Sequence, residues 1–110
     1  MSLSWEDFEK VDMRVGTIVE ALAFAEARKP AYKLHIDFGP LGIKKTSAQI
    51  TKRYLLEDLL GKQVIAVINF PPKQIGNFMS ECLVLGIVGD DNDVILLQPS
   101  DSAVNGDRVL

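Results

Sequence analysis

Two consecutive prolines, Pro71 and Pro72, interrupt an apolar region and limit what the residues around them can form. Proline lacks a backbone N–H and has a fixed φ, so no strand ladder continues through the pair. Residues 64–68, before the pair, are uniformly apolar, which is typical of a strand buried on both faces. A second apolar run covers residues 83–88. The sequence therefore predicts two core strands joined by a stiff loop at residues 69–80.

The predicted loop 69–80 is rich in large apolar side chains. Connecting segments normally run over the surface, so such side chains either pack into the core or form a binding lip. We favour the lip and expect its apolar and polar side chains to contact a ligand. The candidate ligand-binding residues of this loop are Asn69, Phe70, Lys73, Ile75, Phe78, Met79 and Ser80.

Residue patterns predict three strands and a helix ahead of this loop. Apolar and polar residues alternate with a period of two in residues 11–19 and 32–38, and residues 43–50 carry polar groups on both faces. Gly16 would permit a bulge or sharp coil in the first strand. Thr51 favours the start of a helix that runs through about Leu60. Its expected buried stripe is Leu55, Leu56, Leu59 and Leu60.

The order of these elements indicates the fold class. Three strands, a helix and two further strands match the five-stranded Greek-key barrel of the OB fold, whose helix lies between strands three and four. Ser4 is expected to open a short N-terminal helix that ends at about residue 10. Residues 98–110 would form a C-terminal extension. We predict one all-β domain over residues 1–110, a β-barrel with minor helices.

Composition argues against catalysis, metal binding and membrane insertion. No apolar run approaches the roughly 20 residues of a membrane helix, and the acidic N-terminus is unlike a signal peptide, so we expect a cytoplasmic protein. His35 is the only histidine, which leaves no Ser-His-Asp set. The single Cys82 is expected to be a small buried hydrophobe. We expect a binding protein without a cofactor, not an enzyme.

The net charge of −3 conceals an uneven distribution. Residues 28–73 contain nine basic and three acidic side chains, so this span carries +6 and the remainder carries −9. A basic face on an acidic body would suit an anionic partner, and an evenly mixed surface is the alternative.

OB barrels commonly bind ligands across strands two and three. Here that face would present Lys33, Lys45, Ser47 and Gln49. In a nucleic-acid complex the lysines would meet phosphates, while aromatic residues of loop 69–80 would stack on bases. The same apolar lip beside a strand edge would suit an extended peptide. Composition does not separate these two ligands.

Four segments in register resemble proteins of the tRNA-binding-domain family. They are FEKVDMRVGTI at 8–18, SAQIT at 47–51, GKQV at 61–64 and NFPPKQIG at 69–76. Within the family, the chain resembles the export-related chaperones, and wider relatives include the C-terminal appendices of methionyl-tRNA synthetases. The resemblance implies an OB fold, a homodimer, and binding of unfolded preproteins or peptides, or of tRNA, without catalysis.

The chain departs from the tRNA-binding relatives at two positions. Glu81 and Cys82 stand where those proteins commonly have Gln and Gly. A carboxylate in place of an amide at an RNA-facing position would repel phosphates, which favours the peptide-binding, protein-export role. Turn capping is the alternative role for Ser80 and Glu81.

Apolar residues at both ends of the chain lie outside the five-stranded scheme. A homodimer would bury them, and two ligand sites would raise avidity. The expected dimer contacts are Trp5, Phe8, Val109 and Leu110.

Overall fold

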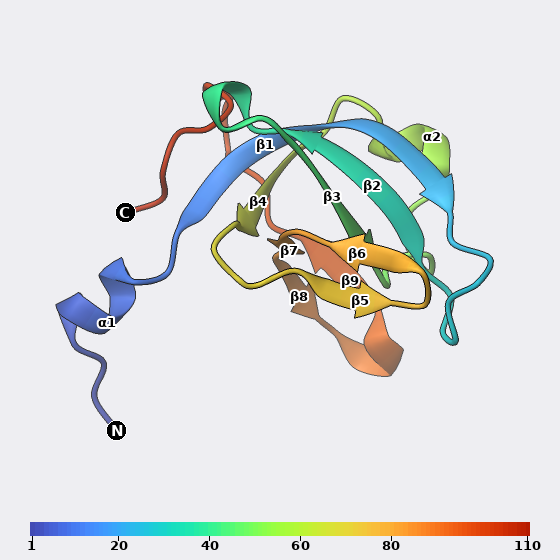
Figure 1. Cartoon of the computed structure of the whole chain (residues 1–110), viewed down its shortest axis with the longest axis horizontal. Helices are drawn as coiled ribbons and strands as arrows, with labels where there is room; N and C mark the ends of the chain where they lie inside the picture. Colours follow the sequence, from blue (N-terminus) through green and yellow to red (C-terminus); the bar gives the residue numbers. More distant parts are fainter.

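A computed structural model describes all 110 residues and shows a curved antiparallel sheet that wraps into a nearly closed barrel (Figure 1). Its five strands are β1 (Met13–Ala23), β2 (Tyr32–Asp37), β3 (Ile43–Ala48), β4 (Gln63–Val67) and β7 (Leu83–Val84). They lie in the order β3-β2-β1-β4-β7, and all neighbours are antiparallel. The predicted OB-type barrel is confirmed.

Two small hairpins and four short helical segments complete the fold. In the hairpins, β5 (Lys73–Ile75) pairs with β6 (Phe78–Ser80), and β8 (Gly86–Val88) pairs with β9 (Val94–Leu96). The helical segments are α1 (Trp5–Glu9), η1 (Gly39–Leu41), α2 (Leu56–Leu59) and η2 (Asp90–Asn92). No helix has the length and apolar character needed to cross a membrane.

The core fills the inside of the barrel. Its fully buried side chains alternate along the strands with residues on the outer face, as the period of two predicts. The largest of them are Phe38, Ile18, Leu34, Ile36, Leu59 and Val64. The strong curvature of β1 lets it pair with β4 through its first half and with β2 through its second half.

Gly16 lets core side chains pack closely against β1. The bulge that was predicted at Gly16 lies instead between Ile18 and Glu20, where the register of β1 with β2 shifts. A Cβ at Gly16 would lie 2.6 Å from Cγ2 of Ile36 and 2.8 Å from the ring of Phe38. Only a residue without a side chain lets these two core groups close over β1.

The helix predicted from Thr51 to Leu60 is wrong in length, because α2 is a single turn. Tertiary hydrogen bonds hold the preceding segment in another conformation: the Tyr32 hydroxyl donates to the Tyr54 carbonyl at 2.7 Å, and the Leu96 N–H donates to the Tyr54 hydroxyl at 3.0 Å. Of the expected buried stripe only Leu59 is buried, while Leu55 and Leu60 are more than half exposed.

The segment 69–88 also differs from the prediction of one loop and one strand. Residues 73–80 form the β5–β6 hairpin, with Gly76 at φ 61° in its turn. The apolar run 83–88 divides at Leu85, whose N–H donates to the Ile65 carbonyl and whose carbonyl accepts from Leu97. The chain thereby leaves β4 and begins to pair with β9.

The two ends of the chain form a short helix and an extension that pairs with β1. The Ser4 hydroxyl accepts from the Asp7 N–H at 3.0 Å and opens α1, which buries none of its residues. The C-terminal extension lies along the first half of β1, since the Gly106 N–H donates to the Val15 carbonyl and the Val109 N–H to the Met13 carbonyl.

Candidate functional site

A groove of about 640 Å³ opens between the end of β3, the β5–β6 hairpin and the segment from β7 to β9. Eleven of its 18 lining residues are hydrophobic, so the groove offers an apolar surface. Away from the β5–β6 hairpin and the proline pair, the apolar lining residues are Ala48, Ile50, Cys82, Leu83, Val84, Leu85, Val88, Val94 and Leu96.

One rim of the groove is formed by the proline pair and the hairpin that follows it. This rim includes Phe70, Pro71, Lys73 and Ile75, and Phe70 is 54% exposed. Lys73 is the one charged residue in the groove lining. This rim corresponds to the first part of the predicted lip. It lies beside the concave surface of the groove and carries a single cation, Lys73.

The structure divides the predicted ligand-binding residues into two sets. Those that line the groove are Ser47, Gln49, Phe70, Lys73, Ile75 and Ser80. Those that lie outside its lining are Lys33, Lys45, Asn69, Phe78 and Met79. Met79 is partly exposed, but Phe78 is only 9% exposed. The expectation that Phe78 projects from the lip is therefore wrong.

Phe78 is buried because it anchors the hairpin to the loop between β1 and β2. It forms a small apolar cluster with Phe24 and Ala31, and Ile75 packs against that cluster. The Phe24 and Phe78 rings meet edge to face with their centroids 5.4 Å apart, a favourable geometry for aromatic pairs. The rim of the groove is thus fixed by a packed aromatic pair.

Lys33 and Lys45 lie over this aromatic pair. The register pairs Lys33 with Ser47 and His35 with Lys45, which confirms that these residues share one face of β2 and β3. The Lys33 ammonium lies 4.7 Å from the Phe24 ring centre, and the Lys45 ammonium lies 5.2 Å from that of Phe78. The hairpin therefore covers part of the face expected to meet a ligand.

Ser80 and Glu81 cap the outer edge of β3. The Glu81 N–H donates to the Lys45 carbonyl at 2.8 Å, and the Lys45 N–H donates to the Glu81 carboxylate at 3.0 Å. The Ser47 N–H donates to the Ser80 hydroxyl at 3.1 Å. A backbone-capping role, not repulsion of a phosphate, accounts for the position of the Glu81 carboxylate.

Asn69 fixes the start of the rim to the segment before β1. Its side-chain oxygen accepts from the Asp12 N–H at 3.0 Å, and its side-chain nitrogen donates to the Lys10 carbonyl at 2.7 Å. Both ends of the Asn69 amide are therefore used within the chain, which positions Phe70 at the groove.

The opposite wall is tied down at the tip of the β8–β9 hairpin. The Arg53 guanidinium donates to both carboxylate oxygens of Asp93, at 3.0 and 2.5 Å, and Lys52 donates to the Asp91 carbonyl. The hydrogen bond from Arg53 lowers the pKa of Asp93 below its usual value. None of the predicted ligand-binding residues lies in this wall.

No candidate for covalent or metal chemistry lies in the groove. Burial raises the pKa of the Cys82 thiol to about 12, so the thiol is protonated at neutral pH and packs as the small hydrophobe predicted. No group of three or more His, Cys, Asp or Glu side chains is placed to hold a metal ion. The arrangement supports binding by shape, apolar contact and hydrogen bonds.

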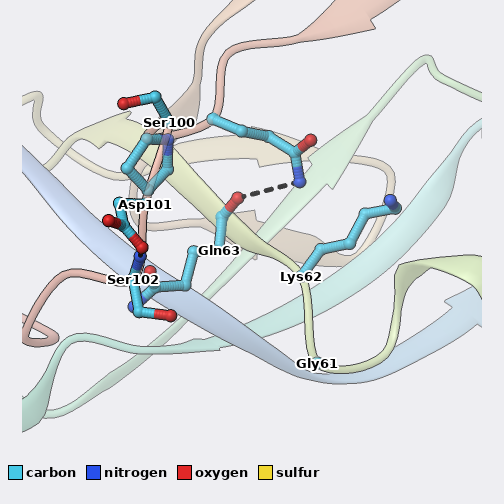
Figure 2. Close-up of a pocket in the computed structure, with 8 residues that line it drawn as sticks. Gly61, Lys62, Gln63, Ser100, Asp101 and Ser102 are labelled. Carbon is cyan, nitrogen blue, oxygen red and sulfur yellow. Dashed lines mark hydrogen bonds between the residues drawn. The ribbon is translucent and has the colours of Figure 1, made fainter.

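A second depression, of about 410 Å³, lies between residues 61–63 and 98–102 (Figure 2). None of its lining residues is hydrophobic. Gln98 donates to the Gln63 carbonyl, and the Gln63 side chain exchanges two hydrogen bonds with the Ala103 backbone. These polar groups attach the C-terminal extension to the barrel and leave the apolar groove as the candidate site.

Comparisons with known proteins match this architecture. The family model of the tRNA binding domain matches residues 13–108. A crystal structure of the chaperone CsaA from Bacillus anthracis is 53% identical, covers 100% of both chains and has a TM-score of 0.96. The CsaA chaperone protein from Picrophilus torridus is 51% identical over 99% of this chain and 100% of that one, with a TM-score of 0.92.

A methionine–tRNA ligase from Chlorobium chlorochromatii is 35% identical over 108 residues. The match covers 98% of this chain but 15% of the ligase, so the chain corresponds to a small part of that enzyme.

Proposed function

The chain belongs to the tRNA-binding-domain family as a CsaA-like binding module, and we propose that it is a chaperone that holds unfolded, export-bound polypeptides in its apolar groove. The observation that carries this proposal is the composition of the groove, which combines a mostly hydrophobic lining with a single charged residue, Lys73. Unfolded chains expose apolar side chains that such a surface would bury. The role is one of binding, with no reaction and no cofactor, and it implies a cytoplasmic location.

RNA is a poorer match to the groove than a polypeptide. Nucleic-acid grooves carry several cations that follow the phosphate backbone. Here Lys33 is paired with Glu26 at 3.2 Å and rests on an aromatic ring, and Lys45 also lies over a ring. The alternative function, tRNA binding across β2 and β3, is supported by the family match and by these same cations.

A salt titration separates the two functions. An RNA complex with roughly five phosphate contacts should weaken with a log-log slope of about −3 to −4, whereas an apolar peptide in the groove should respond little. Lys73→Glu should weaken a tRNA complex much more than a complex with a neutral unfolded peptide. Lys10→Glu, an exposed change at the C-cap of α1, serves as the control. Equal losses for both ligands on Lys73→Glu would contradict separate electrostatic and apolar contributions.

We also propose that the single domain of residues 1–110 forms a homodimer. Trp5 is 83% exposed and Leu110 is 99% exposed, while Phe8 and Val109 are half-buried. Such side chains at both ends of a chain gain stability when a second copy covers them. Light scattering should give about twice the chain mass of 12.1 kDa, and a mass near that of one chain would refute the dimer.

A further inference from the structure

We propose that the groove binds its polypeptide through the main chain, as an added strand along the open edge formed by β7 and β8. The inference rests on the proposed function, because it requires a polypeptide in the groove. It specifies an extended apolar segment as the ligand and hydrogen bonds to Val84, Gly86 and Val88 as the means of recognition.

The β7–β8 edge presents its main chain on the side away from the existing ladders. The Leu85 N–H bonds to β4, the Leu85 carbonyl bonds to Leu97, and the Gly89 N–H bonds to Asp93. Hydrogen-bonding direction alternates along an antiparallel strand. The N–H and carbonyl groups of Val84, Gly86 and Val88 must therefore point the other way.

No strand covers these outward groups. β7 pairs only with β4, and β8 pairs only with β9. All three outward residues line the groove. Gly86 has no side chain, so its contribution to the lining is its main chain. The groove is therefore bordered by a row of unpaired main-chain donors and acceptors, which is the feature that a β-strand ligand completes.

The environment of this edge selects an apolar ligand of low charge. The side chains of Val84 and Val88 lie on the same face of the strand and would contact alternate side chains of an added strand. Lys73 is the one charge in the lining, and it complements a single carboxylate, not a run of phosphates. The ligand is therefore an extended segment with alternating apolar residues and one acidic residue.

Backbone-methylated peptides test this mode directly. The parent probe is a fluorescein-labelled peptide of alternating leucine and serine that ends in glutamate, and its affinity is measured by fluorescence anisotropy. Two variants carry N-methyl groups on the leucines only or on the serines only. Pairing along one edge uses the N–H groups of alternate residues, so one variant should bind about tenfold more weakly than the parent. The affinity of the other variant should stay within about threefold of that of the parent.

Three outcomes would overturn the inference in distinguishable ways. Equal affinity of all three peptides would show that side chains alone are recognised, and the proposed function would stand. Equal weakening by both methylation patterns would exclude pairing along this one edge, again without affecting the proposed function. Failure of the parent peptide to bind would overturn the proposed function together with the inference.

Discussion

Val88→Glu is expected to weaken the binding of an unfolded polypeptide by at least about tenfold. Val88 lines the groove and is 67% exposed, so the change places a carboxylate among apolar side chains without altering the core. A bound segment would have to desolvate that carboxylate and would lose the apolar contact with valine. A loss of about 1.4 kcal/mol corresponds to tenfold, and burying an unpaired charge costs more than that.

Ile87→Glu is the matched control for this prediction. Ile87 is the neighbouring residue in β8, is 56% exposed, and does not line the groove, whereas Val88 does. Its substitution should change the affinity for the peptide by no more than about twofold. Anisotropy titrations of the two variants compare the groove face of β8 with its opposite face. Thermal unfolding verifies that both variants are folded. Equal losses would show that the groove face of β8 has no special role.

Phe78→Ala is expected to lower the free energy of unfolding by about 3 kcal/mol, at the low end for a buried phenylalanine. The substitution removes the ring that packs against Phe24 and over which Lys33 and Lys45 lie. The β5–β6 hairpin would lose its anchor to the loop between β1 and β2. Because Ile75 and Lys73 belong to that hairpin and line the groove, peptide affinity should fall as well.

Met79→Ala is the control for the loss of the phenylalanine. Met79 lies next to Phe78 in β6 but is 39% exposed and lies outside both the aromatic cluster and the groove lining. In a urea titration of both variants, Met79→Ala should lower the free energy of unfolding by less than about 1 kcal/mol. If the two variants were equally stable, the packed aromatic pair would not be what holds the rim.

The barrel was predictable because its strands carry their pattern locally. Residues 32–38 alternate with a period of two, and that alternation matches the buried and exposed faces of β2. In β1 the same period marked the strand but not its inner face, since Ile18 is buried and Val19 is exposed. The single-turn α2 was not predictable in the same way. Four leucines suggested a long amphipathic helix, but hydrogen bonds from Tyr32 and Leu96 to Tyr54 hold the preceding residues in the barrel wall.

Only one side of the candidate site could be predicted from the sequence. The proline pair pointed to loop 69–80, of which Phe70, Lys73 and Ile75 line the groove. The burial of Phe78 depends on Phe24, a distant residue in a segment without a clear pattern. The opposite wall was missed because the apolar run 83–88 resembled one continuous strand. The change of partner at Leu85, which leaves an edge unpaired, arises only when the barrel closes.

Backbone amide chemical shifts, recorded by NMR as the leucine–serine peptide is added, test the central claim most directly. If a polypeptide occupies the groove, the largest changes should fall on the amides of Val84, Gly86 and Val88 and on Phe70 at the rim. The amides of Lys33 and His35, on the covered face of β2, should remain unchanged. Changes concentrated at Lys33 and His35, with the groove amides unaltered, would contradict the claim.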